Sequence, residues 1–157
     1  MKERKWIPYV LWILFTEAVG FLSGWLTRQG SELYSETIVK PPLSPPAMVF
    51  PIVWGILFVL MGIGAARIYL AESSPARTRS LRIFLLQLAF NFFWSILFFN
   101  FQAFGLALIW LLILWGLILW MIFSFRQVDP PAAWLQVPYL LWVTFAAYLN
   151  FGVWRLN

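Results

Sequence analysis

The chain of 157 residues is 62% hydrophobic and 20% aromatic, and only 11% of its residues are charged. A soluble domain carries roughly 25% charged residues, so a water-soluble fold of this length cannot bury so much apolar surface. The net charge of +5 does not indicate nucleic-acid binding, because the basic residues lie at the ends of apolar segments and form no stripe. The sequence therefore predicts a single membrane domain over residues 1–157.

Histidine and cysteine are both absent from the sequence. Without cysteine there can be no disulfide and no thiolate ligand, and without histidine the chain lacks the most common general base and the usual proximal haem ligand. We therefore expect no metal site and no required cofactor. Any chemistry must use carboxylates, tyrosine, tryptophan or the reactivity of a bound molecule.

Five apolar segments follow one another, and each approaches or exceeds the ~20 residues needed to cross a bilayer. Because unpaired backbone groups are not tolerated in lipid, we expect an all-α membrane protein, a bundle of five transmembrane helices. The short connection Asn100–Phe104 makes the third and fourth helices antiparallel neighbours. The predicted spans are Trp6–Thr27, Pro45–Leu70, Leu81–Phe101, Phe104–Phe125 and Ala132–Trp154.

The first connection, Arg28–Ser44, is the only long loop that the pattern predicts, and prolines crowd its end. Proline is tolerated before a helix and is costly inside one, because it lacks an N–H and clashes with the preceding turn. Pro51 lies about one turn inside the second predicted helix, where we expect it to bend the helix. A stiff loop beside Trp54 indicates a shaped cavity. The prolines that stiffen this loop are Pro41, Pro42, Pro45 and Pro46.

The basic residues also predict the orientation in the membrane. Three of them, Arg28, Lys40 and Arg155, fall on one side, and eight fall on the side of the N-terminus. The positive-inside rule then places the N-terminus in the cytoplasm, and the C-terminus and first loop outside, in a bacterial cell membrane. The eight residues are Lys2, Arg4, Lys5, Arg67, Arg77, Arg79, Arg82 and Arg126.

Glu17 lies near the middle of the first predicted helix, with Gly20 and Gly24 on the same face. A carboxyl group at membrane depth is costly and needs a reason. One interpretation is a cavity-facing or proton-handling carboxylate. The other is a protonated side chain that is hydrogen-bonded to a neighbouring helix, and we favour it because the GxxxG pattern marks this face as a close helix contact.

Gln87, Asn91 and Ser95 are spaced by four residues and form a polar stripe beside Trp94 on the third predicted helix. The stripe can bond neighbouring helices, or it can line a pocket and present an amide to a ligand. Aromatic stripes on the second and fifth helices are typical of lipid-facing belts or ordinary packing. Trp54 and Trp142 differ from the other tryptophans, because each lies near a proline and small or polar residues.

Together these residues resemble the TspO/MBR family, the tryptophan-rich sensory proteins whose animal members are called translocator proteins. The similarity covers nearly the whole chain and is weakest in the first loop. It is carried by four blocks within residues 40–62, 87–99, 138–150 and 153–155. The resemblance implies a five-helix bundle, commonly dimeric, with a ligand cavity that opens toward the first loop.

Members of this family bind porphyrins and other haem-pathway tetrapyrroles, and also synthetic isoquinoline and benzodiazepine ligands; animal members bind cholesterol too. Trp54 and Trp142 match the pair linked in some bacterial relatives to light-dependent breakdown of protoporphyrin, which makes them the candidate catalytic residues. The resemblance implies a gate of Lys40, Pro41, Pro42, Pro45 and Pro46 over a cavity lined by Tyr34, Trp54, Phe58, Asn91, Trp94, Trp142, Ala146 and Leu149.

The chain departs from the family at several positions. Leu33 and Leu43 stand where relatives often have tryptophan, and Phe58 stands where many have tyrosine. The sterol-recognition pattern needs a tyrosine within a few residues of Arg155. Phe151 occupies that position, which weakens the prediction of sterol binding.

Three functions follow as hypotheses. We favour a receptor or sensor that binds porphyrins and regulates their level. The first alternative is light- and oxygen-dependent degradation of the bound porphyrin, with Trp54 or Trp142 relaying the oxidant. The second is transport of tetrapyrroles or sterols, although the chain has no inverted repeat and no paired broken helices.

A porphyrin is a flat aromatic ring with two carboxylates, so indole and phenyl rings can stack on it, at roughly 0.5–1.5 kcal/mol per contact beyond area burial. Its carboxylates would seek Arg28, Lys40 or the Tyr34 hydroxyl. Because histidine and cysteine are absent and Met48, Met61 and the tyrosines are only weak substitutes as haem-iron ligands, we expect no preference for haem over the metal-free ring. We also expect a homodimer through a surface rich in small residues, with Gly105, Ala107, Gly116 and the face of Gly20 and Gly24 as candidates.

Overall fold

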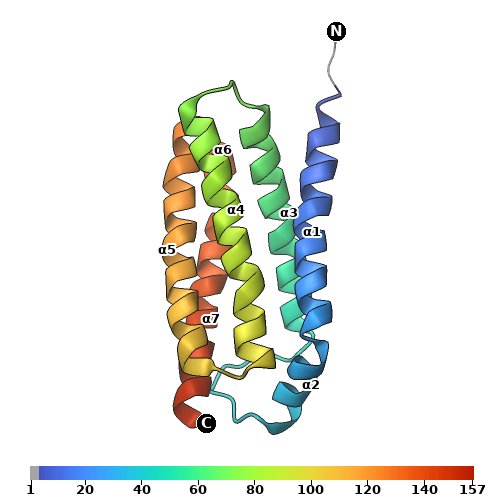
Figure 1. The fold of residues 1–157 in the computed structure, drawn as a ribbon, viewed down its shortest axis with the longest axis vertical. Coiled ribbons are helices and arrows are strands. Elements are labelled where there is room, and N and C mark those ends of the chain that lie inside the picture. The colour runs from blue at the N-terminus through green and yellow to red at the C-terminus, as the bar shows by residue number, and fades with distance from the viewer. Residues whose placement is uncertain (1–3) are drawn as a thin grey trace.

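The computed structural model describes residues 4–157 and is a bundle of five long helices with lengths and compositions that suit membrane crossing (Figure 1). This confirms the predicted all-α membrane fold. Lys2, which contributed to the charge count, lies outside the described residues. The elements in chain order are α1 (Trp6–Leu26), α2 (Arg28–Thr37), α3 (Val49–Leu70), α4 (Pro75–Ser95), the π-helical turn η1 (Ile96–Asn100), α5 (Phe104–Val128), α6 (Pro130–Trp134) and α7 (Val137–Leu156).

The bundle is held together by three main helix pairs, in which α1 packs on α3, α4 on α5, and α5 on α7. The predicted antiparallel pairing of α4 and α5 is therefore confirmed (Figure 1). The core contains large side chains with no exposed surface, among them Met61, Phe84 and Ile118. Large apolar side chains such as Ile109 and Phe123 are more than half exposed, as lipid-facing positions should be.

Several helix boundaries differ from the predicted ones, and two of the differences have a clear local cause. The helix predicted from Leu81 begins at Pro75, because the Ser74 hydroxyl accepts a hydrogen bond of 3.1 Å from the Arg77 backbone N–H and proline suits the first helical position. Its polar first turn carries no hydropathy signal. The last predicted segment is divided after Trp134, because Pro138 has no N–H with which to continue the helical ladder.

The sequence predicts a long loop for the first connection, and this prediction is wrong in part. The connection contains the helix α2, which lies at the end of the bundle away from the N-terminus (Figure 1). Its sequence is polar, so hydropathy gives no sign of it. Gly30 lets α2 approach η1 closely, since a Cβ at this position would collide with the backbone of Phe99. Asn100 of η1 also donates a hydrogen bond of 3.1 Å to the backbone oxygen of Leu26, at the end of α1.

The structure gives no reason for the helix bend that was expected at Pro51. Helix α3 begins at Val49, so Pro51 lies in its first turn, where backbone N–H groups have no acceptor within the helix. The helix continues without a break to Leu70. Proline at this position in the first turn removes no hydrogen bond from the helix interior.

Helices α1 and α3 touch over only part of their length. Gly62 lies against the backbone of Ile13, and the Thr16 hydroxyl donates a hydrogen bond of 2.7 Å to the Phe58 backbone oxygen. Gly20 packs on the Phe58 ring. Of the two GxxxG glycines, Gly20 makes the predicted helix contact. This contact between α1 and α3, called the seam below, supports one side of the cavity described next.

Candidate functional site

A cavity of about 650 Å³ lies in the half of the bundle nearest α2. Its size falls within the range of roughly 300–1,000 Å³ that is usual for small-molecule sites. Its lining comes from α1, α2, the loop before α3, α3, α4, η1 and α7. Most of its lining surface is apolar, although only about half of the lining residues are apolar or aromatic and many of the others carry hydroxyl, amide or charged groups.

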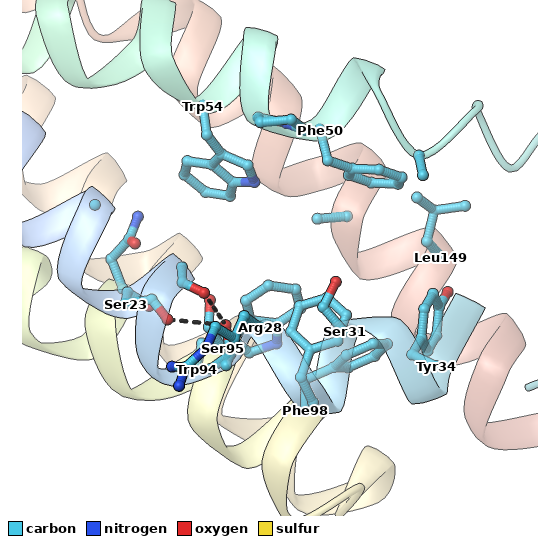
Figure 2. A pocket seen from close by; sticks show the side chains of 18 of the residues that line it. Ser23, Arg28, Ser31, Tyr34, Phe50, Trp54, Trp94, Ser95, Phe98 and Leu149 are labelled. Carbon is cyan, nitrogen blue, oxygen red and sulfur yellow. Dashed lines mark hydrogen bonds between the residues drawn. The ribbon is translucent and has the colours of Figure 1, made fainter. Parts of the chain in front are cut away.

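One wall of the cavity is aromatic and comes from α3. Phe50, Trp54 and Phe58 recur every four residues and so share a helix face that lines the cavity. The Trp54 ring centroid lies 5.7 Å from that of Phe58 and 6.2 Å from that of Tyr139 on α7. Figure 2 shows Trp54 and Phe50 side by side on this wall.

The facing wall is also aromatic and comes from α4, η1 and α2. Trp94 lies 5.1 Å from Phe98 between ring centroids, and Tyr34 lies 5.3 Å from Phe98. These three rings lie across the open space from Trp54 and Phe50 (Figure 2). A flat aromatic ligand between the walls could therefore contact rings on both faces.

The polar stripe of α4 both bonds a neighbouring helix and lines the cavity. Tyr139 donates a hydrogen bond of 2.6 Å to Gln87 Oε1 and accepts one of 2.8 Å from Asn91 Nδ2, so the stripe joins α4 to α7. Gln87 is fully buried, whereas Asn91 and Ser95 line the cavity. Among residues 4–157, no donor reaches the amide oxygen of Asn91, which leaves this acceptor for a ligand.

Glu17 lines the cavity as well. Its carboxyl group makes no hydrogen bond or ion pair with the described part of the chain. The alternative that the sequence favoured, a hydrogen bond to a neighbouring helix, is therefore not present. The structure corresponds to the other alternative, a cavity-facing carboxyl group.

Three polar residues lie where the cavity meets α2. Lys40 Nζ donates hydrogen bonds to the backbone oxygens of Tyr34 (3.2 Å), Ser35 (3.1 Å) and Ile38 (3.1 Å), which occupies all its donors at the end of α2. Arg28 Nη1 donates to the Trp25 backbone oxygen at 2.6 Å, and other guanidinium N–H groups remain. Burial raises the pKa of the Tyr34 hydroxyl above its usual value, so it stays protonated and can donate.

The proline loop, residues 40–48, closes this end of the cavity, but only some of its predicted gate residues line it. Lys40 and Pro45 do. Pro41 packs against Gly152 of α7, and the Pro42 backbone oxygen accepts a hydrogen bond of 2.7 Å from Tyr148. The Pro46 backbone oxygen accepts one of 3.0 Å from the Val49 N–H, so Pro46 belongs to the turn that leads into α3.

Seven of the eight predicted ligand-binding residues line the cavity, and Trp142 does not. Its ring lies 5.9 Å from Phe50 and 5.5 Å from Phe145 between centroids, and its indole N–H is buried with no hydrogen-bond partner in residues 4–157. Phe50 takes the lining position that was assigned to Trp142. The seven that line the cavity are Tyr34, Trp54, Phe58, Asn91, Trp94, Ala146 and Leu149.

The sequence prediction also missed several lining residues. Phe50 could have been found, because it lies one helical repeat before Trp54. Ser31 could not, because the helix α2 that carries it was not predicted. Phe98 and Phe99 reach the cavity through the π-helical turn η1, which changes the direction of the side chains after Ser95. Phe151 and Arg155, the residues of the sterol pattern, are exposed on α7 and do not line the cavity.

The cavity reaches the surface of the bundle between α1 and α3. Gly24 and Gly55 both line it, and a Cβ added to either would meet nothing within 4 Å. Phe21 and Pro51 line it too and are exposed. The two helices, which touch at Gly20 and Gly62, thus leave a side opening beyond Gly20, toward what would be lipid.

No group of three or more acidic residues that could hold a metal ion occurs among residues 4–157. The five apolar helices and the cavity between them define an integral membrane protein with an internal aromatic cavity.

The model of the TspO/MBR family matches residues 12–155, and the chain belongs to this family. It is 38% identical to the tryptophan-rich protein TspO of Chlorobaculum tepidum over 89% of each chain. It is 36% identical to the translocator protein of Bos taurus over 97% of this chain and 91% of that one. It is 33% identical to the tryptophan-rich sensory protein of Cereibacter sphaeroides over 96% of this chain and 94% of that one.

Proposed function

We propose that the protein is a membrane receptor or sensor that binds porphyrins, such as protoporphyrin IX and other haem-pathway tetrapyrroles, and regulates their level. The observation that carries this proposal is the pair of facing aromatic walls, with Trp54 and Phe50 on one side and Trp94 and Phe98 on the other (Figure 2). A planar macrocycle has two faces to stack, and each aromatic contact adds roughly 0.5–1.5 kcal/mol beyond area burial.

The polar groups of the cavity suit the rest of such a ligand. Arg28 has guanidinium N–H groups left for a propionate, whereas the donors of Lys40 are held by backbone oxygens. Asn91 Oδ1 can accept a hydrogen bond from a ring N–H. Because the sequence contains no histidine or cysteine, we expect metal-free protoporphyrin to bind as tightly as haem or more tightly.

Titration of the purified protein with protoporphyrin IX tests this function. Trp54→Leu and Trp94→Leu should each weaken binding by about tenfold, because each removes a stacking surface. Trp134→Leu is the matched control, since Trp134 is 73% exposed and lies outside the cavity. Equal affinity in all four proteins would overturn the proposal, and a histidine-like shift of the haem Soret band would overturn the expected indifference to metal.

Photo-oxidative degradation of the bound porphyrin is the second candidate function. Trp54 favours it, because this oxidisable ring lines the cavity and also contacts Tyr139. Illumination of the complex in air, with and without Trp54→Phe, tests this candidate. Pigment loss no faster than with free tryptophan or an unrelated membrane protein would exclude it, and protein-dependent flux of porphyrin into sealed vesicles would support transport instead.

We infer that the protein lies in a bacterial cell membrane with its N-terminus in the cytoplasm. The chain has no cysteine, so single cysteines can be introduced at Arg126 and Leu43 without background. A membrane-impermeant thiol reagent applied to whole cells should label Leu43→Cys and spare Arg126→Cys. The reverse pattern would invert the topology.

A homodimer through α5 is the assembly that the small residues favour. Gly105 packs on Trp154 and Ala107 is fully buried, so neither is free for another chain. Gly116 is exposed, and a Cβ there would meet nothing within 4 Å. Cross-linking in native lipid should therefore give a dimer that Gly116→Leu weakens, and a wild-type protein that stays monomeric would contradict this.

A further inference from the structure

A second hollow, of about 610 Å³, lies between α4 and α5 at the end of the bundle that carries the N-terminus. Figure 1 shows that this end is opposite α2, so the hollow is remote from the aromatic cavity. It combines basic and apolar side chains. Its lining consists of Pro75, Thr78, Arg79, Arg82, Ile83, Leu86 and Trp120.

The two kinds of side chain occupy different depths. Arg79 and Arg82 are one turn apart on α4, about 6 and 10 Å along the helix from Pro75, so both lie near the end of the apolar span that begins there. Leu86 comes one turn deeper on the same face. Leu86 and Trp120 are 44% and 51% exposed, so they form an apolar surface open to lipid.

The charge of the two arginines is not compensated within the described residues. The one ion pair in residues 4–157 joins Arg67 to Asp129, and its Nε–Oδ2 distance is 2.6 Å. Arg79 Nη2 donates a hydrogen bond of 3.0 Å to Gln127 Oε1. This partner is neutral, so it orients the guanidinium group without neutralising its charge. Two exposed guanidinium groups one helical turn apart form a suitable clamp for a phosphate.

We propose that this groove binds an anionic phospholipid of the adjacent leaflet, with its phosphate between Arg79 and Arg82 and an acyl chain along Leu86 and Trp120. Basic pockets between membrane helices favour such headgroups, and the apolar half of the groove distinguishes a lipid from a soluble phosphate. A second copy of the chain fits less well, because two-fold packing on this groove would bring the arginines of both copies together.

Full-length protein in nanodiscs of phosphatidylcholine with increasing phosphatidylglycerol provides the test, with native mass spectrometry counting the retained lipids. Wild-type protein should retain phosphatidylglycerol selectively, and Arg79→Gln and Arg82→Gln should each weaken it by about fivefold. Arg126→Gln is the matched control, because Arg126 is exposed near the same end and lies outside the groove. Trp120→Ala should reduce retention of both lipids and leave the selectivity unchanged.

Three results would overturn the proposal. They are equal retention of the two lipids by wild type, an equal loss in Arg126→Gln, and displacement of phosphatidylglycerol by millimolar inorganic phosphate. Cross-linking of Trp120→Cys to a second chain at full occupancy would likewise show that a protein covers the groove. Unchanged porphyrin affinity in the arginine variants confirms their folding, because the cavity lies at the other end.

Discussion

The indole nitrogen of Trp94 donates a hydrogen bond of 3.1 Å to Oδ1 of Asn150. The Asn150 amide nitrogen in turn donates one of 2.8 Å to the Phe104 backbone oxygen. One side chain thus ties a wall of the cavity on α4 to α7 and to the start of α5. Asn150 is 1% exposed, so water hardly competes for these bonds and the Trp94 ring is oriented before any ligand arrives.

Asn150→Ala should therefore loosen the cavity. It leaves the Trp94 indole N–H without its partner, which costs about 1–3 kcal/mol of stability for a buried donor. Thermal unfolding in detergent should show this loss, and porphyrin titration should show weaker binding. Asn157→Ala is the control, because Asn157 bonds Val39 at the exposed end of α7. An Asn150→Ala protein that matches this control in both measurements would contradict the role.

Tyr139 is the second tie between α4 and α7. Its hydroxyl is the only partner of Gln87 Oε1 within residues 4–157, and the Gln87 amide nitrogen already lacks an acceptor there. Tyr139→Phe should destabilise the fold by about 1–3 kcal/mol, because it leaves a further buried polar atom unsatisfied. Tyr148→Phe, which loses only an exposed bond to Pro42, should cost less in the same unfolding measurement. Equal losses of stability in the two variants would mean that the buried hydrogen bond of Tyr139 to the polar stripe contributes no more than an exposed one.

Much of the fold was predictable because lipid imposes one simple requirement. Twenty apolar residues must form a helix, so hydropathy alone located five spans. The cavity residues on α3 and α4 followed from the period of 3.6 residues, which places Trp54 with Phe58 and Asn91 with Trp94 on neighbouring parts of one face. Their assignment to a ligand site came from the family resemblance.

The remainder depends on contacts that leave no periodic signal. Helix α2 is polar and is stabilised by the close approach of Gly30 to η1. Trp142 has the helical spacing of a lining residue, but Phe50 lies against it and takes that position. The sequence contains both rings, and only the contact between α3 and α7 determines which one faces the cavity.

This difference between Trp54 and Trp142 gives a prediction about binding. Trp54→Phe should weaken porphyrin binding, because it shrinks a ring that lines the cavity. Trp142→Phe should leave affinity within about twofold and cost little stability, because the indole N–H that it removes has no partner in the described structure. Fluorescence titration of both variants measures the effect. A larger loss in Trp142→Phe than in Trp54→Phe would place Trp142 in the ligand site after all.

The side opening between α1 and α3 gives a prediction about rates. An apolar ligand dissolved in the bilayer could enter there, where Gly24 and Gly55 leave open space. Gly24→Leu and Gly55→Leu should fill this opening and slow porphyrin association. Their stability should be unchanged or higher, because nothing lies within 4 Å to collide with the new Cβ and glycine inside a helix is unfavourable by roughly 0.5–1 kcal/mol relative to alanine.

Gly20→Leu is the contrasting variant, because it would collide with the Phe58 ring and so should destabilise the seam. Stopped-flow mixing of protein nanodiscs with porphyrin-loaded vesicles separates the association rate from stability, which thermal unfolding measures. If Gly24→Leu and Gly55→Leu bind porphyrin as fast as wild type, the ligand must enter past the proline loop. Pro45, the one proline of the predicted gate that lines the cavity, would then control access.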